Sequence, residues 1–394
     1  MHVAICGPIS LRLLENDVSH VGQLPAGYQY PFAAYLVKEY IRLGHFVSVV
    51  TNTVDVDKNT RWSGKQCAIV AIPRRQKARA LIRNFYRDEV REMSEALKQI
   101  APDIIHAQWT YEFADAALVS GLPTLVTARD SPFRIARILR HPYRWLRAIY
   151  SRAYVLPRIM HLTAISDYLA CELQWLHGYP RKIDVIPNGI ATGRVCNNPR
   201  FGYKHHDVVN IYCVSEWGVR KNIKMLLMAF AHVREKNPNV RLILIGRGLG
   251  ENDEGCAWAI KKELHVAVSF RGYQDQKSIM HGLRDEADLF VNPTLEESFG
   301  MIFIEAMSQG VACVGGKASG AVPWILNNGC AGILANVKNP IQLAEAISSI
   351  LHDPIRLAVL AEEGYRRSKE IFALETIAQN YILKYQHILN QEEG

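Results

Sequence analysis

The chain has 394 residues, of which 49% are hydrophobic and 21% charged, with no low-complexity tract. This length predicts two or three domains, each large enough to bury a core. The eight cysteines include no CxxC pair, and no His/Cys cluster has zinc spacing, so we expect reduced thiols in a cytoplasmic protein. Neither a signal peptide nor a run of 18 apolar residues is evident, which leaves peripheral contact as the expected mode of membrane association.

The net charge of +8 is concentrated in the first half of the chain. Segment 74–91 has seven basic residues against two acidic ones, and segment 129–158 has eight arginines against one aspartate. In segment 129–158 the arginines alternate with apolar and aromatic residues, as in helices that lie at a membrane interface. We therefore expect this segment, broken by Pro132 and Pro142, to dock on an anionic membrane surface at the inner face. The alternative is a solvated basic face over ordinary core positions.

Strands and helices are expected to alternate along the chain, which is typical of mostly parallel sheets covered on both faces. In the first half, helices are expected at 32–43, ending at Gly44, and at 83–99; the expected strands are 2–7, 46–51, 103–108, 124–129, 161–166 and 182–189. A second series of strands begins at 209–215; it continues at 240–246, 267–273, 288–293, 311–316 and 331–336. Two such series predict two Rossmann-like α/β domains that face each other. The polar segment 192–207 is the expected linker, and a last helix is expected at 375–389.

The segment 292–310, NPTLEESFGMIFIEAMSQG, carries the most specific pattern. The apolar residues after Gly300 recur at helical spacing, and a buried strand is expected to end at Pro293. This order predicts a strand, a tight loop and a helix that begins near Gly300. Because a helix N-terminus has unpaired N–H groups and partial positive charge, it suits a phosphate. Glu297 and Glu305 then offer acceptors for hydroxyl groups on either side of that phosphate.

The string formed by Glu297, Glu305, Ala306-Met307 and Gly310 resembles the signature of the family 4 retaining glycosyltransferases. The resemblance implies the GT-B fold, with an acceptor domain at 1–195, a nucleotide-sugar donor domain at 205–374, and a C-terminal helix, 375–394, that packs back on the first domain. It also implies transfer of a hexosyl unit from a nucleotide sugar, most readily a UDP-sugar. The acceptor that it implies is a hydroxyl of a glycan or lipid-linked molecule in polysaccharide or glycolipid synthesis.

The resemblance assigns the donor site residue by residue. Lys221 matches the lysine that contacts the diphosphate, Glu297 contacts the sugar and Glu305 the ribose. The family's arginine five or six residues before the lysine is absent, and Arg220 is the candidate to replace it. The remaining donor-binding candidates are Gly27, in the loop after the first strand, Tyr273, which is expected to stack on the base, and Ser298, Phe299, Gly300, Met301 and Ile302 around the helix start.

Two positions in the first half depart from the family pattern. His106 resembles a family histidine, although the usual second histidine is Gln108 here, and a core role is the alternative. Arg129 stands where the family has a histidine near the reacting centre. Because arginine stays protonated, it cannot act as a base. We expect it to bind an anionic acceptor or the diphosphate. A third departure is Trp324, where the family usually has glutamate.

The sequence predicts no cofactor and no metal. Asp55-Val56-Asp57 is a D-x-D, the metal-binding motif of another glycosyltransferase fold, but it is expected to be a solvated loop because Lys221 and the helix start already offset the diphosphate charge.

Two other classes of function remain open. One is a GT-B-type phosphorylase or nucleotide-sugar epimerase. The other is a basic nucleic-acid-binding protein, but no nucleic-acid-binding motif is evident and we expect no nucleic acid partner.

Overall fold

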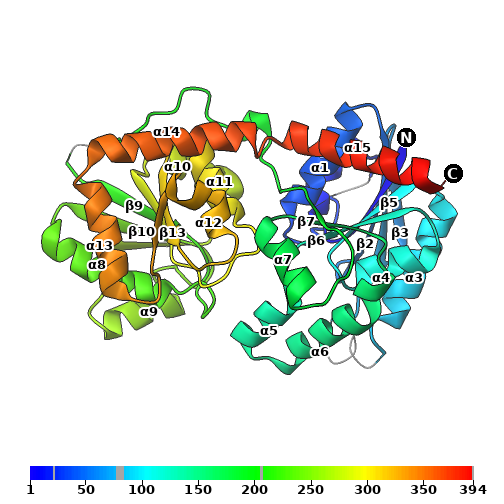
Figure 1. Cartoon of the computed structure of the whole chain (residues 1–394), viewed down its shortest axis with the longest axis horizontal. Helices are drawn as coiled ribbons and strands as arrows, with labels where there is room; N and C mark the ends of the chain where they lie inside the picture. The colour runs from blue at the N-terminus through cyan, green and yellow to red at the C-terminus, as the bar shows by residue number, and fades with distance from the viewer. Residues whose placement is uncertain (21–22, 77–83, 205–206, 393–394) are drawn as a thin grey trace. The chain divides into compact units, whose positions relative to one another are not determined.

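A computed structural model describes residues 1–20, 23–76, 84–204 and 207–392. The chain divides into two compact units, the first of which is discontinuous in sequence. Unit 1 comprises Met1–Gly189 and Leu374–Gly394, and unit 2 comprises Ile190–Ala373. Each unit contains one β-sheet flanked by helices (Figure 1).

Unit 1 is built on an eight-stranded sheet with the order β3-β4-β2-β1-β5-β6-β7-β8. Neighbouring strands are parallel except β3 and β4 at one edge. The strands are β1 (His2–Cys6), β2 (Phe46–Thr53), β3 (Thr60–Ser63), β4 (Cys67–Pro73), β5 (Ile104–Gln108), β6 (Thr124–Ala128), β7 (His161–Ala164) and β8 (Asp184–Val185). Because β2 and β5 flank β1 on opposite sides, the order reverses at β1. Open α/β sheets bind ligands at such a point, outside the carboxyl ends of the strands.

The helices of unit 1 are formed by segments with apolar residues on one face and polar residues on the other. They are α1 (Pro31–Arg42), α3 (Arg87–Ile100), α4 (Glu112–Ser120), α5 (Pro132–Leu139), α6 (Pro142–Tyr150), α7 (Asp167–Trp175) and α15 (Leu374–Glu392), with short helices η1 (Leu11–Asp17), η2 (Ser151–Val155) and η3 (Leu156–Arg158). Proline begins α1, α5 and α6, a position where the missing N–H costs no helical hydrogen bond.

The last helix, α15, completes the core of unit 1. It packs on α1, and its buried Tyr381 and Tyr385 lie against the ring of His106 on β5. The Tyr385 hydroxyl lies 2.7 Å from the Tyr40 hydroxyl and 2.6 Å from Nδ1 of His106. A residue late in the chain therefore satisfies polar groups deep within the first unit.

Unit 2 has a six-stranded, fully parallel sheet with the order β11-β10-β9-β12-β13-β14. The strands are β9 (Val209–Val214), β10 (Val240–Ile245), β11 (Val268–Gly272), β12 (Leu289–Asn292), β13 (Ala312–Gly316) and β14 (Ile333–Ala335). The helices are α8 (Ile223–Lys236), α9 (Glu254–Lys261), α10 (Gln276–Asp285), α11 (Met301–Ser308), α12 (Val322–Ile325), α13 (Pro340–Leu351) and α14 (Pro354–Glu370), with η4 (Thr192–Arg194) and η5 (Asn327–Gly329).

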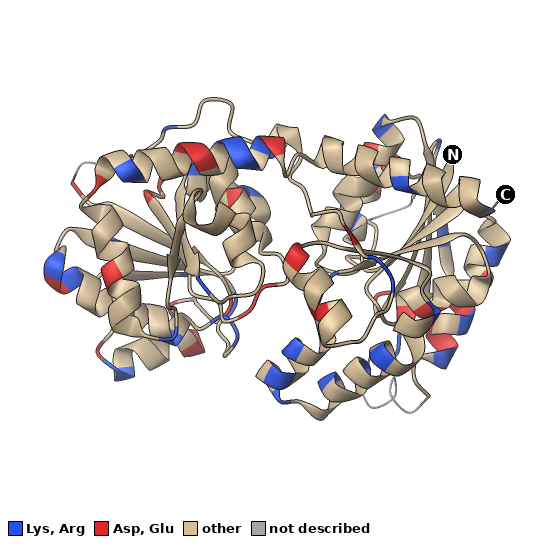
Figure 2. Ribbon diagram, viewed as in Figure 1, with Lys and Arg blue, Asp and Glu red and all other residues tan. Residues whose placement is uncertain are grey.

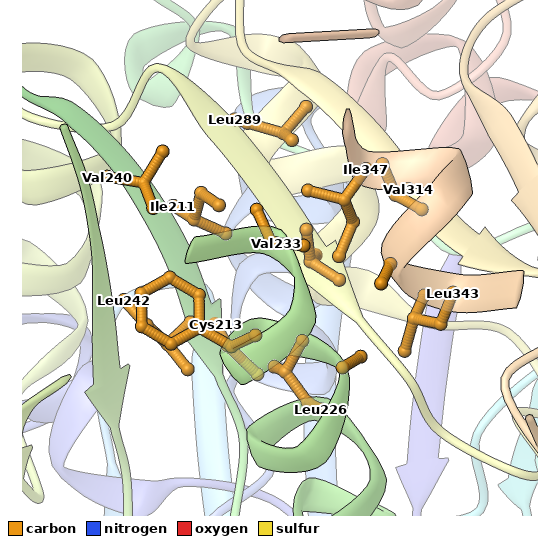
Figure 3. Packing of buried hydrophobic residues seen from close by; sticks show 14 of the residues in the cluster. Ile211, Cys213, Leu226, Val233, Val240, Leu242, Leu289, Val314, Leu343 and Ile347 are labelled. Carbon is orange, nitrogen blue, oxygen red and sulfur yellow. The ribbon is translucent and has the colours of Figure 1, made fainter. Parts of the chain in front are cut away.

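The hydrophobic core of unit 2 lies between the sheet and the paired helices α8 and α13. Figure 3 shows Leu226 and Val233 of α8 and Ile347 of α13 packed over residues of β9, β10 and β12. Ile211 on β9 is opposite Leu242 on one side and Leu289 on the other. This continuous apolar packing fixes the carboxyl ends of β9 and β12, from which the candidate site is built.

The strands that the sequence predicts are present, but β3 and β4 were not predicted. Helix α3 begins at Arg87; the predicted start at Arg83 lies outside the described residues. Segment 192–207 was expected as a linker, but where it is described it packs within unit 2. The Cys196 N–H donates to the Ser308 carbonyl, and the Tyr203 hydroxyl donates to the Leu351 carbonyl.

None of the helices in the described part of the chain is long and apolar enough to span a membrane.

Candidate active site

The predicted strand, loop and helix are confirmed at β12 and α11. Strand β12 ends at Asn292, and α11 begins at Met301, directly after Gly300. Gly300 has φ +99°, a conformation that side chains other than glycine rarely adopt. A Cβ at this position would also lie 3.1 Å from the Phe303 ring. Glycine is therefore required where the chain turns into the helix, whose first N–H groups have no partner within the helix.

The loop 293–300 is held by two neighbouring turns of unit 2. The Leu295 N–H donates to the Arg220 carbonyl at 2.8 Å, which ties the loop to the turn after β9. The Ala321 N–H donates to the Glu297 carbonyl at 2.8 Å, and the Ser319 hydroxyl donates to the Thr294 carbonyl at 2.6 Å. Both of these bonds come from the turn after β13. The loop therefore has a fixed backbone onto which its side chains can be placed with precision.

Glu297 lies between two cations of the turn after β9. Lys221 Nζ is 2.5 Å from Glu297 Oε1, and Arg220 Nη1 is 3.6 Å from Oε2. Glu297 is only 9% exposed. Burial raises the pKa of Glu297, but the charges of Lys221 and then Arg220 outweigh burial and leave the pKa below its ordinary value. The carboxylate is therefore ionised, and the group as a whole keeps a surplus of positive charge.

The structure explains how two adjacent residues reach one carboxylate. On a helix, Arg220 and Lys221 would point about 100° apart. Both instead lie in the turn before α8, where Asn222 has φ +59°. Arg220 Nη1 also donates to the Glu296 carbonyl at 3.1 Å. Arg220 is thus part of the Glu297 cluster and not a free surface charge.

Glu305 occupies a different environment, one turn into α11. It is buried and pairs with Arg194, whose Nη2 lies 3.2 Å from Glu305 Oε1. Burial raises the pKa of Glu305, and the charge of Arg194 offsets this only in part. Arg194 was not predicted, because its distance along the chain from Glu305 follows no motif spacing.

An aromatic group supports the start of α11. The Phe299 ring packs against Trp324 at 6.1 Å and Phe372 at 5.8 Å between centroids. Arg367 lies over both Trp324 and Phe372, and donates to the Trp324 carbonyl at 2.9 Å. Trp324, where the family usually has glutamate, therefore packs next to the residue that precedes Gly300.

The remaining donor-site candidates of unit 2 lie around this loop or near another strand end. Ser298 is buried and its hydroxyl donates to Glu296 Oε1 at 3.4 Å. Met301 and Ile302 are the first two residues of α11 and are half-buried. Tyr273 directly follows β11, and its side chain is 65% exposed, so its ring is accessible to a ligand.

In unit 1, Gly27 and Asp55 contact each other. Gly27 has φ +67°, and its N–H donates to Asp55 Oδ2 at 2.8 Å. The same oxygen accepts the Thr53 hydroxyl at 3.0 Å. The Gly27 N–H, our candidate for backbone approach to a diphosphate, thus already has an acceptor. Within the described residues no group of three or more His, Cys, Asp or Glu side chains is placed to hold a metal ion.

His106 is fully buried and both ring nitrogens have partners. Nε2 lies 2.6 Å from the Thr127 hydroxyl, and Nδ1 lies 2.6 Å from the Tyr385 hydroxyl. Burial and the nearby Arg129 charge hold the pKa of His106 well below its ordinary value. This geometry favours a neutral core histidine over the catalytic role that the resemblance implies.

Arg129 is also buried, but it lies at the carboxyl end of β6. Its Nε donates to Gln108 Oε1 at 2.7 Å, and Nη1 donates to Asn188 Oδ1. Its guanidinium lies 4.8 Å from the Phe32 ring centroid. Its hydrogen-bond partners are thus neutral amides, and no carboxylate lies within 4.0 Å of it in the described part of the chain.

Two family models match the chain. The model described as glycosyl transferases group 1 matches residues 202–367, and the model described as glycosyltransferase family 4 matches residues 32–194. The chain belongs to the family 4 glycosyltransferases. The predicted family is thereby confirmed, and the Lys221, Glu297 and Glu305 positions all lie within the first of these matches.

Curated relatives of this glycosyltransferase match over part of their length. D-inositol 3-phosphate glycosyltransferase of Segniliparus rotundus is 28% identical over 245 residues, or 58% of this chain and 54% of the relative. The lipopolysaccharide core biosynthesis glycosyltransferase LpsE of Rhizobium meliloti is 28% identical over 206 residues, or 52% and 58%. The chain thus spans about half the length of these relatives.

Solved structures confirm the GT-B fold. Sucrose-phosphate synthase from Thermosynechococcus elongatus aligns with a TM-score of 0.78 and 18% identity, covering 99% of this chain and 100% of the other. An E. coli trehalose-6-phosphate structure, bound with UDP-2-fluoro glucose, aligns with a TM-score of 0.71 and 12% identity, covering 98% and 99%. At these identities the likeness shows the fold alone.

Proposed function

We propose that the chain transfers a hexosyl unit from a nucleotide sugar to an acceptor hydroxyl with retention of configuration. The observation that carries the proposal is the cluster of Lys221, Arg220 and Glu297 beside the glycine-started helix α11. Two cations and unpaired helix N–H groups suit a diphosphate, and a buried ionised carboxylate suits a sugar hydroxyl. A UDP-sugar is the proposed donor, a choice supported by the UDP-2-fluoro glucose bound to a neighbour of the same fold.

In the proposed reaction the bond between the sugar C1 and the β-phosphate oxygen breaks, and its electron pair stays on that oxygen. The acceptor oxygen bonds to C1 from the same face, and its proton moves to the departing phosphate oxygen. No covalent intermediate with the enzyme forms. Lys221, Arg220 and the first N–H groups of α11 stabilise the charge that develops on the diphosphate. Glu297 orients the sugar, and Glu305 contacts the ribose.

The donor proposal is tested by a thermal-shift screen with UDP-, GDP- and ADP-sugars, followed by NMR of the sugar that the enzyme transfers or releases. We expect a UDP-sugar to raise the melting temperature most and the product to keep the donor's anomeric configuration. An inverted product would overturn retention. Failure of all three nucleotide-sugar classes to shift the melting temperature would overturn the donor site.

We further propose that the acceptor is a glycan or lipid-linked molecule and that the enzyme acts at the cytoplasmic face of a membrane. The support is the surface of α5 and α6, which lie against each other in unit 1. Trp145 and Ile149 are 42% and 52% exposed. Figure 2 shows blue basic segments on these two helices, and residues 132–150 contain no Asp or Glu. Exposed apolar side chains next to cations are typical of interfacial helices.

The structure reduces the set of arginines available for this surface. Arg134 pairs with Glu172, Arg147 with Glu112 and Arg158 with Asp115, while Arg129 is buried. The other four of segment 129–158 have no carboxylate within 4.0 Å among the residues that the structure describes; they are Arg137, Arg140, Arg144 and Arg152. At about 1 kcal/mol each near an anionic surface, four arginines suffice for reversible binding.

A cavity of about 550 Å³ adds to the argument for a lipid-linked acceptor. It lies in unit 1 against α3, α4 and the end of α6, and its lining includes the half-exposed Phe85, Ile149 and Tyr154. Arg87, Arg91 and Lys98 of α3 also line it and outnumber the two carboxylates of the lining, Glu95 and Asp115. An apolar cavity with cations beside it, sharing Ile149 with the surface of α6, fits a lipid chain with an anionic headgroup.

A further inference from the structure

A group of aromatic and polar side chains lies in unit 1, at the carboxyl ends of its strands. Its centre is Trp109, the residue after β5. The Trp109 ring lies 6.3 Å from Tyr28 and 6.4 Å from both Tyr30 and Tyr111 between centroids. Phe113 packs on it at 6.3 Å. We call these five residues the Trp109 cluster. Trp109, Tyr28 and Tyr30 are half-buried, whereas Tyr111 and Phe113 are buried. The three half-buried rings, at this edge of an α/β sheet, are placed to contact a ligand.

Trp109 has a strained backbone. Its φ of +68° is rare for any residue except glycine and unusual for one this large. Its N–H donates to the Thr127 carbonyl at 2.9 Å, which holds the strained residue in place at the sheet edge. Such strain persists only where the surrounding structure maintains it, and it is enriched at sites that bind or react.

Three arginines lie over the rings of the Trp109 cluster. Arg74 is 5.6 Å from the Tyr28 ring centroid, Arg129 is 6.0 Å from that of Tyr30, and Arg147 is 3.8 Å from that of Tyr111. Of these, Arg147 pairs with Glu112 at 3.4 Å. Neither Arg74 nor Arg129 has a carboxylate within 4.0 Å in the part of the chain described here. The three arginines around the Trp109 cluster therefore carry more positive charge than the neighbouring carboxylates offset.

Several buried polar atoms around the Trp109 cluster have no hydrogen-bond partner within the described structure. Four unpaired N–H donors are Nε of Arg74, Nε of Arg147, Nε2 of Gln108 and Nδ2 of Asn52, and the Tyr30 hydroxyl is unpaired as well. Gln108 is 0% exposed and Asn52 1%, although both are bonded through their oxygens, to Arg129 and the Tyr28 hydroxyl. Because buried donors are nearly always paired, a set of four in one region indicates a ligand that accepts hydrogen bonds.

One unpaired acceptor, Oδ1 of Asp130, accompanies these donors. The other Asp130 oxygen accepts the Tyr111 hydroxyl at 3.1 Å. A carboxyl oxygen next to arginine and amide donors complements a ligand that carries both an anionic group and a hydroxyl. Aromatic faces complement the apolar face of a sugar ring. A neutral glycan would use the rings and Asp130 but would leave Arg74 and Arg129 without an anionic partner.

We propose that the Trp109 cluster, with Arg74 and Arg129, binds an acidic sugar as the acceptor, its phosphate or carboxylate held by the arginines and its ring against Trp109. The inference rests on the proposed function for the word acceptor, since the cluster lies wholly in unit 1 and the donor residues in unit 2. The chemistry shared by phosphate and carboxylate is an oxyanion with two or more acceptor oxygens, which an arginine fork fits.

The test is isothermal titration of the full chain with inorganic phosphate, glucose 6-phosphate, glucuronate and glucose, with and without UDP. We expect at least one acidic sugar to bind about tenfold or more tightly than glucose, as a lost charge-assisted hydrogen bond implies. Glucose 6-phosphate and glucuronate separate the two sources of the anion. Binding of glucose as tight as that of both acids, or no binding of either acid, would overturn the proposal.

Arg74→Gln is a better test variant than a change of Arg129. The Arg74 side chain has no hydrogen bond whose loss would harm the fold, whereas the Arg129 side chain has three. Arg74→Gln is expected to weaken binding of the acid about tenfold, while Arg61→Gln, the same change on the exposed strand β3, leaves it unchanged. Equal affinities of both variants and wild type would overturn the assignment. If the wild-type chain failed to bind UDP but still bound the acid, the result would count against the proposed function and not against this inference.

Discussion

Glu297 and Glu305 are both buried, yet their pKa values shift in opposite directions because they have different partners. For each, burial raises the pKa of the carboxyl group. Glu297 has Lys221 at 2.5 Å and Arg220 at 3.6 Å, and the two charges together lower its pKa. Glu305 has Arg194 at 3.2 Å, and its pKa stays raised. Because its pKa is lowered, Glu297 stays negatively charged at a lower pH than an ordinary glutamate. This charge suits Glu297 to stabilise the positive charge that develops on a sugar during transfer.

Glu297→Gln is predicted to reduce kcat by about 100-fold or more, the usual cost of removing one such electrostatic contact. The side chain keeps its shape and loses only the charge. Circular dichroism and the melting temperature should show an intact fold. The matched control is Glu362→Gln, on the exposed side of α14, which should leave kcat unchanged. A folded Glu297→Gln enzyme with a tenth of wild-type kcat would disprove the role.

His177 gives the protein a predicted acid sensitivity. Burial lowers the pKa of His177 from 6.5 to about 4; Glu172 raises this pKa and Arg152 lowers it, both by smaller amounts. Because the unfolded chain binds a proton near pH 6.5 and the folded chain does not, this contribution to stability is full above pH 6.5 and is lost as the pH falls toward 4. We predict that wild type loses up to about 2 kcal/mol more than His177→Leu between pH 7 and 5.

The measurement for His177 is urea unfolding of both proteins at pH 7 and 5. His352→Leu, at an exposed position, is the control and should follow wild type. The Phe133 ring, 4.8 Å from that of His177, packs on either side chain, so the variant should fold. The same pH dependence in His177→Leu and wild type would contradict the prediction.

Residue identity in the site was predictable, but side-chain partners were not. Glu297, Glu305 and Lys221 were found by motif. The approach of Arg220 to Glu297 depends on the left-handed conformation of Asn222, which no pattern of residue types specifies. Arg194 reaches Glu305 across 111 positions of sequence. Contacts of this kind follow from the tertiary packing of unit 2 and therefore cannot be predicted from local sequence patterns.

At the scale of elements, the start of α11 depends on Gly300. Gly300→Ala is predicted to cost about 1–2 kcal/mol of stability, because alanine is strained at φ +99°. It should also weaken UDP binding, because the new Cβ would press on Phe303 and displace the helix start. Gly44→Ala is the matched control: its φ is +84°, but a Cβ there meets open space at the end of α1.

Thermal unfolding and UDP titration of both glycine variants make the test. Each should lose stability, and only Gly300→Ala should lose affinity for UDP. If Gly44→Ala lost as much UDP affinity, the effect would come from general destabilisation and the proposed phosphate cradle would lose its support.

For α5 and α6, the prediction is salt-sensitive binding to vesicles that contain phosphatidylglycerol. The triple variant of Arg137, Arg140 and Arg144 to Gln should sediment with them far less than wild type at low salt, since each arginine contributes about 1 kcal/mol. The control triple changes the exposed Arg12, Arg61 and Arg356 to Gln. Negligible binding of wild type to both anionic and neutral vesicles would remove the membrane proposal.

Most strands were predictable because strands buried on both faces read as continuous apolar runs. The same reasoning applies to Cys67–Pro73, whose apolar run forms β4, so this strand was missed although its sequence indicated it. β3 is a short edge strand with alternating burial, and it is ordered by its antiparallel pairing with β4. The Trp109 cluster was not predictable, since its rings come from two segments about 80 positions apart in the chain, 28–30 and 109–113.

For the whole molecule, we predict that turnover needs no divalent cation. Lys221, Arg220 and the helix N–H groups are proposed to offset the diphosphate charge that a metal ion offsets in other enzymes. Activity measured in excess EDTA should equal that with Mg²⁺ or Mn²⁺ added. Loss of turnover in EDTA that either metal restores would contradict the prediction and direct attention to Asp55 and Asp57.

The discontinuity of unit 1 has a consequence for synthesis on the ribosome. Domains fold as they emerge, at about 5–20 residues per second. Unit 2 is continuous in sequence, so all of its strands are available before α15 is made. Unit 1 begins first but finishes last, because Nδ1 of His106 waits for Tyr385, which is translated 279 positions later. The amino-terminal half therefore spends the whole translation of unit 2 with an open core, during which chaperones have their best access to it.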